Sequence, residues 1–306
     1  MKRLFGFGGK PDASHQAGRV WTRDEVEAKL INASPTAGTA LIARLRPAVR
    51  LIASPMQDQR IPVGATKFGG RPDLPRDFAW PSWRNPQDEV RPLGFYAQIS
   101  LDEINTAAPA PLGLGAAGLL SFFCDYAYDG LNGITGLMSW EQPGCRIIHS
   151  LATGLVRYES QAMEWPSGSL AAFPIWTRPA SIPGVKLPDS EFDGLDAFDR
   201  AYESSIAGSS TSARHQAGGH AMFIQHPVEV EVVQALFASD EHGRVDPERW
   251  KAARVRVPEW RVVLQIDSDN GLDVMWGDAG MLYWAARQED IDQDNWTNAM
   301  FNFQCS

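Results

Sequence analysis

One stretch near the C-terminal end of the sequence gathers carboxylates that could coordinate a cation. Residues 262–284 run from one apolar segment to another across an acidic turn, which holds Asp267, Asp269, Asp273 and Asp278. They match positions 1, 3, 7 and 12 of a calcium-binding EF-hand loop, but such a loop has glycine at position 6, glutamate at position 12 and flanking helices. Here glycine stands fifth, aspartate stands twelfth, and both flanks resemble strands. The stretch therefore favours a β-turn, and only the first three aspartates remain candidate calcium ligands.

Paired carboxylates can also serve as acid and base in the hydrolysis of a glycosidic bond, while tryptophans stack on the sugar rings. Trp80, Trp83 and Trp276 are the candidates for such stacking, but the chain has 11 tryptophans, and most of them must fill its core. A metal-assisted or carboxylate hydrolase that uses the turn from Asp267 to Asp278 is therefore the alternative function.

Three histidines in the second half of the chain do not have the spacing of zinc ligands. His215, His220 and His226 cannot share one helical face, because Gly218-Gly219 interrupts any helix between them. We interpret them as dispersed surface or turn histidines. The sequence has no GxSxG elbow, no Walker loop and no GxGxxG after a strand, so it specifies no reaction.

A second segment, residues 61–86, is irregular but rich in aromatic side chains. Its five prolines and three glycines exclude an interior helix or a central strand. The aromatic residues should pin an ordered loop to the body, and such loops often carry function. The glycine pair beside the lysine is not the GxxxxGK[ST] motif of a phosphate-binding loop. The candidate binding-surface residues of this segment are Lys67, Phe68, Gly69, Gly70, Trp80 and Trp83.

The two regions share a pattern that suggests an internal duplication. Gln98-Ile99 recurs as Gln265-Ile266, and the glycine-led run 118–122 recurs as 280–284. Each copy predicts a strand, a turn and a second strand. A buried amide both donates and accepts hydrogen bonds, so each glutamine either fastens a neighbouring loop or faces a ligand cleft. The loop-fastening interpretation is favoured.

The remaining elements are short. Helices are expected after the capping box of Thr22 and Glu25, between Pro35 and Pro47, at residues 191–206, and from Asp246-Pro247. Alternating valine and glutamate predict a half-exposed strand at 227–237, and the Ser- and Gly-rich residues 208–219 are expected to be flexible.

Composition limits the functions that the chain can have. With 306 residues and 44% hydrophobic content, the chain can bury a sizeable core. Its net charge of −9 argues against a nucleic acid as partner, because phosphate contacts need clustered Lys and Arg. Three scattered cysteines suit a reducing compartment, and the sequence shows neither a signal peptide nor an apolar run of membrane-spanning length. A cytoplasmic protein is expected, without a membrane or nucleic-acid partner.

Four segments together resemble the YwqG-like family of bacterial proteins. They are GATKFGGRPDLPRDFAWP (64–81), GFYAQI (94–99), the segment 218–225, and VLQIDSDNG with MWGDAGMLYW (263–284). The resemblance covers roughly residues 50 to 304, and the family is catalogued as a domain of unknown function. It implies an α+β fold dominated by antiparallel sheet and a cytoplasmic location. It brings no catalytic residues, and suggests toxin neutralisation only at the level of the family.

The sequence thus predicts an α+β fold, mainly antiparallel β-sheet, with a duplicated strand–turn–strand unit and a few flanking helices. An N-terminal arm with helices (1–48) precedes a YwqG-like domain (49–306), whose halves (about 49–180 and 217–306) flank an insertion at 182–216. We expect a non-enzymatic protein-binding module whose partner is a protein attracted by the negative charge, and the family resemblance suggests an immunity-like, toxin-neutralising role. Its recognition surface would join the 64–83 and 267–278 loops and also include Gln98, Gln265, Trp276 and Asp278. No cofactor is expected unless the turn binds calcium, and the oligomeric state is not predicted.

Overall fold

The structure is a computed structural model that describes residues 19–84, 88–125, 128–129, 133–134, 144–182, 184–207, 213–240 and 244–306. Residues 1–18 of the predicted arm and 208–212 of the Ser- and Gly-rich segment lie outside the described residues. The strands are β1 (Arg46–Pro55), β2 (Lys67–Phe68), β3 (Asp73–Pro75), β4 (Ser82–Arg84), β5 (Val90–Pro92), β6 (Gly94–Ser100), β7 (Leu119–Cys124), β8 (Tyr128–Asp129), β9 (Gly133–Ile134), β10 (Cys145–Ser150), β11 (Leu155–Arg157), β12 (Gly168–Thr177), β13 (His215–Ala217), β14 (Trp260–Asp267), β15 (Met281–Arg287) and β16 (Met300–Gln304). The helices are α1 (Arg23–Ala33), α2 (Gly38–Ile42), α3 (Leu101–Ala107), α4 (Asp189–Ala207), α5 (Val228–Phe237), α6 (Pro247–Ala253) and α7 (Gln288–Asp292), with 3-10 turns η1 (Asp58–Arg60) and η3 (Arg254–Glu259).

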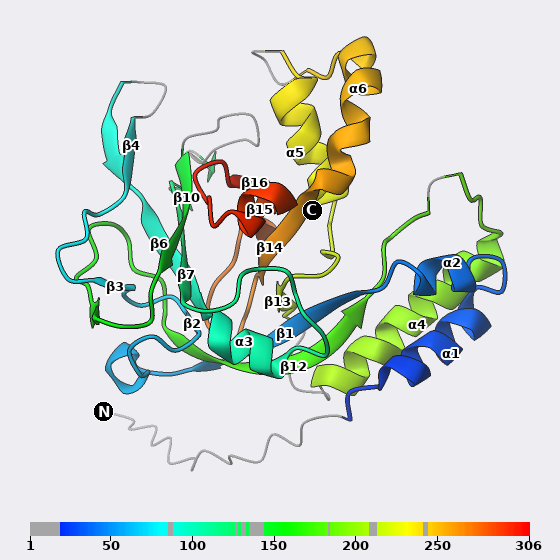
Figure 1. Ribbon diagram of the computed structural model, residues 1–306, viewed down its shortest axis with the longest axis horizontal. Coiled ribbons are helices and arrows are strands. Elements are labelled where there is room, and N and C mark those ends of the chain that lie inside the picture. Colours follow the sequence, from blue (N-terminus) through cyan, green and yellow to red (C-terminus); the bar gives the residue numbers. More distant parts are fainter. Residues whose placement is uncertain are drawn as a thin grey trace, which may run out of the picture.

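Ten strands form one antiparallel sheet in the order β10-β7-β6-β2-β12-β1-β13-β14-β15-β16. Figure 1 shows that this sheet is strongly curved. Its two edges approach each other, because Sγ of Cys145 in β10 donates to the carbonyl oxygen of Ala299 beside β16, over 3.2 Å. The sheet is therefore nearly barrel-like, and the predicted α+β fold with a mainly antiparallel sheet is confirmed.

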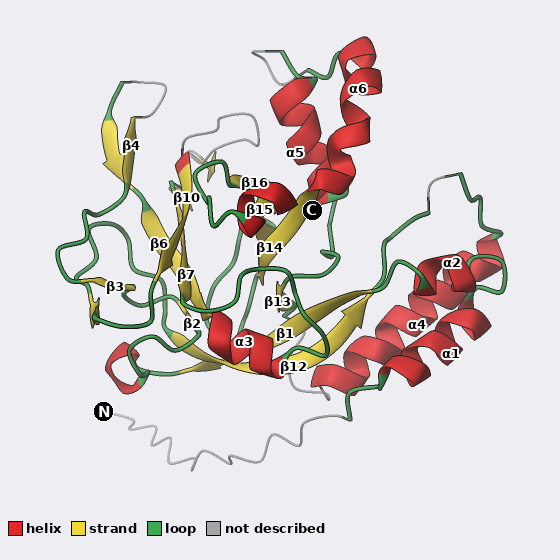
Figure 2. Cartoon of the chain, viewed as in Figure 1, coloured by secondary structure: helices red, strands yellow, loops and turns green. Residues whose placement is uncertain are grey.

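The two faces of the sheet bury different clusters. The inner face holds the largest apolar cluster, which includes the buried rings of Phe68, Tyr96, Trp276 and Trp284. Three separate groups cover the outer face: α1, α2 and α4 on β1 and β12, α5 and α6 on β14 to β16, and the 74–95 region on β6 and β7. Figure 2 shows the helices of the first two groups as separate lobes at the side and the top of the sheet.

The ten strands divide in sequence order into two sets of five, and the central β1–β12 pair takes one strand from each set, with four strands on either side. In sequence order, β1, β2, β6, β7 and β10 form one set, and β12, β13, β14, β15 and β16 form the other; β1 pairs with β13, whereas β12 pairs with β2. Both the β6–β7 and β14–β15 pairs contain a bulge, centred on Tyr96 and Val263. The bulge moves Val262 to the outer face while Leu264 and Ile266 stay inside.

Several local predictions are confirmed. Thr22 and Glu25 form the predicted capping box at the start of α1. The predicted amphipathic helix at 191–206 is α4, and the Asp246 side chain accepts from the N–H groups of Glu248 and Arg249 at the start of α6. Each of these signals depends on neighbours within one or two turns, which the sequence displays directly.

Other local predictions are wrong. Residues 227–237 form helix α5 and not a strand, because Val228, Val232 and Val233 also have helical spacing and are completely buried against β14 and β15. Helix α2 ends at Ile42, and Pro47 lies inside strand β1. A central strand was excluded for 61–86, yet β2 lies within the large sheet between β6 and β12, since two residues suffice to bridge its neighbours.

The long pairing of β1 with β12 crosses the predicted domain boundaries. The register runs from Arg46–Thr177 to Pro55–Gly168, so the predicted boundary at residues 48 and 49 falls within β1. Helix α4, inside the predicted 182–216 insertion, packs on the outer face of this same pair. None of the helices in the described ranges is long and apolar enough to cross a membrane.

Candidate functional site

Two buried glutamines hold matching loops beside the sheet. Oε1 of Gln98 in β6 accepts from the N–H of Asp73 (2.9 Å), and its Nε2 donates to the carbonyl of Ala65 (2.8 Å). Oε1 of Gln265 in β14 accepts from the N–H of Met222 (2.9 Å), and its Nε2 donates to the carbonyl of Arg214 (2.7 Å). Both side chains are fully buried, and these hydrogen bonds confirm the loop-fastening interpretation.

Each fastened loop turns at a glycine pair, Gly69-Gly70 or Gly218-Gly219. All four residues have positive φ, from 56° to 74°, where a side chain is strained. The N–H of Gly69 donates to the carbonyl of the bulge residue Tyr96 (2.8 Å), and the N–H of Gly218 donates to that of the bulge residue Val263 (3.0 Å). The two loops therefore follow the same backbone course.

These contacts identify residues that occupy matched positions in the two loops. A Cβ atom on Gly70 would lie 2.3 Å from Oδ1 of Asp58, and one on Gly219 would lie 2.5 Å from Oγ1 of Thr177. Asp58 and Thr177 therefore stand at corresponding places behind the glycine pairs. Likewise Asp73 and Met222 correspond, because their N–H groups bind the matched glutamines.

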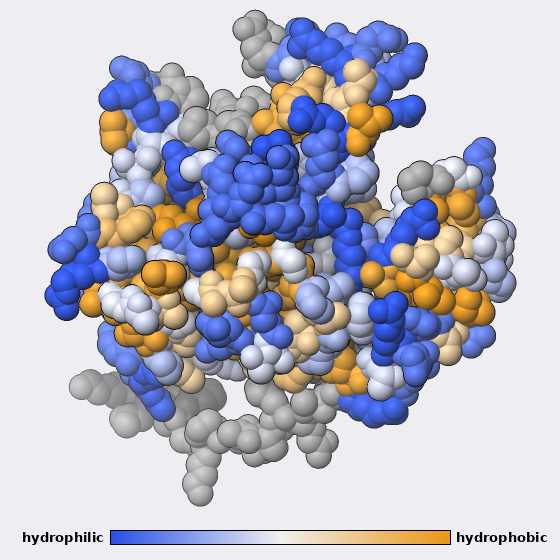
Figure 3. Space-filling model, viewed as in Figure 1, coloured by the Kyte–Doolittle hydropathy of each residue, from blue (hydrophilic) through white to orange (hydrophobic). Residues whose placement is uncertain are grey.

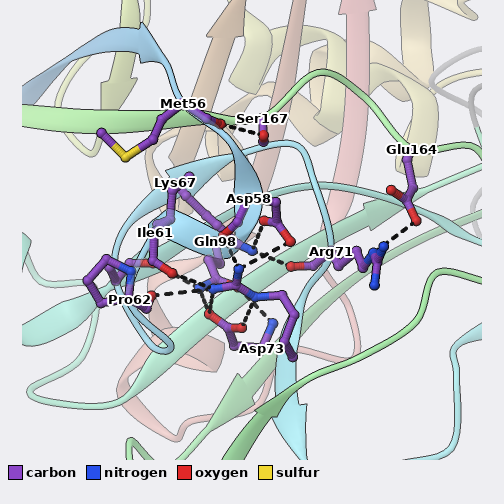
Figure 4. Close-up of polar contacts among 12 residues, drawn as sticks. Met56, Asp58, Ile61, Pro62, Lys67, Arg71, Asp73, Gln98, Glu164 and Ser167 are labelled. Carbon is purple, nitrogen blue, oxygen red and sulfur yellow. Dashed lines mark hydrogen bonds and ion pairs between the residues drawn. The ribbon is translucent and has the colours of Figure 1, made fainter.

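In the first loop, the matched residues Asp58, Lys67 and Asp73 (Figure 4) form a buried ionic group with Arg157, which we call the first clasp. Nζ of Lys67 donates to Oδ1 of Asp58 (2.8 Å) and to the carbonyl of Arg71. Nε of Arg157 donates to Oδ1 of Asp73 (2.6 Å), whose other oxygen accepts from the N–H of Gly64 (2.9 Å). Two cations thus face two carboxylates.

The charges of the first clasp support one another. Burial lowers the pKa of Lys67, against the opposing effect of the Asp73 charge. Burial alone would raise the pKa of Asp73, but the hydrogen bond from Arg157 and the charge of Lys67 bring it below its usual value. Lys67 and Asp73 are completely buried, so removing either charge would leave the buried group with one charge that is not balanced.

The second loop has no such ionic group, because Thr177, Gln216 and Met222 stand at the positions of Asp58, Lys67 and Asp73. We call these three residues, together with the adjacent Arg214, the second clasp. Gln216, which precedes its glycine pair as Lys67 does, donates through Nε2 to the carbonyls of Gly218 (2.9 Å) and His220 (3.0 Å). Thr177 accepts from the N–H of His220 (2.8 Å). A hydroxyl and a thioether therefore stand where the first clasp has its carboxylates.

A cavity of about 460 Å³ lies beside the second clasp, between α4 and the outer face of β1, β12 and β13; we call it the α4 cavity. Polar residues that line it are Arg50, Arg178, Arg214, Gln216, Glu203 and His220. The cavity has the size of a small-molecule site. In Figure 3 the surface is indented between the lobe of α1, α2 and α4 and the lobe of α5 and α6.

Arg50, in the middle of β1, is the unusual residue of the α4 cavity. Its side chain is only 3% exposed, and its Nη2 donates to Oε1 of Glu203 (2.6 Å). Its Nε and Nη1 have no hydrogen-bond partner among the described residues, and neither does Oε1 of Gln216, which stands directly opposite in β13. Burial lowers the pKa of Arg50, but a guanidinium stays charged in proteins. Two donor nitrogens and one acceptor oxygen are thus left without a partner among the described residues.

The other charged groups around the cavity are unevenly matched. Arg178 is bidentate on Asp199, whose pKa is raised by burial against the effect of the arginine. The guanidinium of Arg214 makes no ion pair with a described carboxylate, and its Nη1 lies 3.3 Å from Sδ of Met222. Burial also lowers the pKa of His220 to about 4, so this imidazole is neutral at pH 7.

The predicted acidic turn is built from internal hydrogen bonds. Oδ2 of Asp267 accepts from the N–H of Arg214 (2.9 Å), and Asp269 accepts from the N–H of Gly271 (2.7 Å) and from Nε2 of His215 (3.1 Å). Asp273 and Asp278 are exposed, and Asp273 has a positive φ of 56°. Over the described ranges of the chain, no three His, Cys, Asp or Glu side chains are grouped as metal ligands.

The two segments predicted to form one surface meet through buried rings. Phe68 and Trp276 lie 6.3 Å apart between ring centroids, inside the inner core cluster. Trp80 packs edge-on against Phe123 at 5.6 Å, in the cluster on the outer face of β6 and β7. Seven of the predicted surface residues are buried: Lys67, Phe68, Gly69, Gly70, Gln98, Gln265 and Trp276. Trp83 is also buried, which leaves Trp80 and Asp278 at least partly accessible.

Sequence reasoning missed two residues of this region. Arg50 carried a signal, since it interrupts the apolar run of β1 at a position that faces the same side as Ala48. His215 was interpreted as a surface or turn residue, which is wrong: it lies in β13, is 2% exposed, and accepts at Nδ1 from the N–H of Asp267 (3.1 Å). Only the strand neighbours, distant in sequence, make this burial evident.

Comparison with known proteins gives a family and no activity. A family model described as "Domain of unknown function (DUF1963)" matches residues 66–305. The match includes the second clasp and most of the α4 cavity lining but begins after Arg50 and Asp58. No curated protein matches the chain.

Proposed function

The chain belongs to the DUF1963 family of domains of unknown function, and we propose that it is a non-enzymatic binding protein that holds a small anion in the α4 cavity. One observation carries this proposal: Arg50 is buried beside the cavity with two guanidinium nitrogens unpartnered. A buried donor without a partner costs about 1–3 kcal/mol, which an anionic acceptor recovers. This proposal keeps the expected non-enzymatic binding role, but it replaces the protein partner at the 64–83 and 267–278 loops with a small anion in the α4 cavity.

The comparison of the two clasps supports a negatively charged ligand. The first clasp supplies one carboxylate for each of its two cations. The second clasp replaces both carboxylates with Thr177 and Met222. The nearby Arg50 pairs only with Glu203, and Arg214 pairs with no described carboxylate. Carboxylates and phosphates fit a guanidinium through paired hydrogen bonds. An anionic ligand would therefore take the place that Asp58 and Asp73 fill in the first clasp.

The test uses inorganic phosphate as the probe and thermal unfolding as the measurement. Phosphate should raise the Tm of the unmodified protein, and Arg50→Met should abolish that rise. Glu203→Gln removes the carboxylate that competes for Arg50, so it should tighten phosphate binding about threefold. Arg71→Met is the matched control, because Arg71 pairs with the exposed Glu159 beside the first clasp. A phosphate response that is equal in all four proteins would exclude the α4 cavity as the binding site.

A protein partner is the second candidate, favoured by one exposed patch. Met275 is 53% exposed between the exposed Asp273 and Asp278, so an apolar side chain lies within an acidic turn. This arrangement suits a basic protein with an apolar contact residue. Met275→Ala and Asp278→Ala should each lose partner proteins in a pull-down. Leu151→Ala, at another exposed apolar position, is the control and should keep them. Unchanged partner profiles would count against it.

We also propose that the chain is related to the YwqG-like proteins and that its two matched units arose by duplication. The shared fastening glutamines, glycine pairs and bulges support a duplication. Toxin neutralisation rests on the family resemblance alone. A divergent pair of units explains how one loop came to be closed by ions and the other to border a cavity.

A further inference from the structure

The α4 cavity has a polar end and an apolar end along helix α4. At the polar end Arg50 pairs with Glu203, near the end of the helix. About three turns earlier in the helix, Phe192 and Leu195 line the apolar end. An inorganic anion would use only the first of these.

A second, smaller cavity extends the apolar end. It has a volume of about 40 Å³ and shares Ala180, Phe192 and Leu195 with the α4 cavity. Its other lining residues are almost all aliphatic: Ala37, Leu41, Ser181, Ile182, Val185 and Leu187. Phe192 is 53% exposed and Val185 is 38% exposed, so apolar side chains stand open to water at this end.

We infer that the ligand is amphipathic, with a carboxylate head at Arg50 and an aliphatic tail that runs past Ala180, Phe192 and Leu195. This inference rests on the proposed function. The carboxylate of Glu203 already accepts a hydrogen bond from Arg50, so a ligand carboxylate would accept in the same way. A tail in the apolar end would cover Phe192 and Val185, and burying apolar surface strengthens binding.

Calorimetric titration with acetate, hexanoate and decanoate tests the tail, and decanol tests the head. Affinity should rise by about fourfold for each methylene that is buried. Decanol, which has no charge, should bind at least tenfold more weakly than decanoate. Decyl phosphate, compared with decanoate, shows whether the head is a carboxylate or a phosphate, and a clear preference for the phosphate would overturn the carboxylate assignment.

Ala180→Phe blocks the tail end without touching Arg50. Ala180 is exposed, so the larger side chain should not disturb folding, and it should remove the gain in affinity with chain length while acetate binding persists. Ala152→Phe is the control, since Ala152 is exposed and lies outside both linings. Equal Arg50-dependent binding of acetate and decanoate would overturn the amphipathic ligand and leave the proposed function standing. If no anion binds at all, the proposed function fails with it.

Discussion

The two clasps have one backbone pattern and opposite chemistry. Each has a glycine pair at positive φ, a bulged strand beside it and a buried glutamine that fastens the loop. The first clasp adds three ion pairs among its four charged side chains, which hold the loop in place. The second clasp is neutral at the same places and borders a cavity. The backbone pattern is thus sufficient for the loop, and the charges are free to differ.

The largest effect should come from breaking the first clasp. Asp73→Ala leaves Arg157 and Lys67 buried without one of their two carboxylates, and it should lower the free energy of unfolding by about 3–5 kcal/mol. The matched substitution Met222→Ala removes only a half-buried side chain and should cost about 1 kcal/mol. Chemical denaturation measures both values. Equal losses would mean that the ion pairs do not set the two clasps apart.

The two clasp regions should lose stability in different pH ranges on acidification. Because burial lowers the pKa of His220 from 6.5 to about 4, the unfolded chain binds a proton before the folded chain does. The contribution of His220 is therefore present above pH 6.5 and is lost as the pH falls toward 4, by about 2–3 kcal/mol. Asp73, whose pKa is lowered, contributes above its usual value of 3.8, and this contribution is lost only below that pH.

The measurement is the free energy of unfolding between pH 7 and pH 3. His220→Gln should flatten the decline between pH 6.5 and pH 4 and leave the steeper loss below pH 4 unchanged. His226→Gln is the control, because the second histidine lies close in sequence but outside the cavity lining. A decline that is identical in the two variants would show that His220 is not held neutral by its surroundings.

The contrast between the clasps also explains which features could be predicted from the sequence and which could not. The Gln-Ile repeats and the glycine pair 69–70 were visible, because a repeated short pattern and a turn residue are local signals. The partners were not visible: Lys67, Asp58 and Arg157 are brought together by β2, η1 and β11, which the sequence did not predict as neighbours. The same is true of Arg50 and Glu203, which lie on β1 and α4. Aromatic residues in an irregular segment predicted a surface, but the rings of Phe68 and Trp276 serve the core.

The smallest effect on stability should come from giving the second clasp a carboxylate. Met222→Asp places an acid at the position of Asp73, within reach of the Arg214 guanidinium that contacts Met222. Met222 is half-buried, and the new carboxylate would pair with the Arg214 guanidinium. The free energy of unfolding should therefore change by less than about 1 kcal/mol. The phosphate-induced rise in Tm, however, should fall, because the new carboxylate repels the anion and occupies Arg214. Met275→Asp adds the same charge to an exposed turn and should leave the rise unchanged. A full phosphate response in Met222→Asp would mean that the missing carboxylates of the second clasp are unrelated to ligand binding.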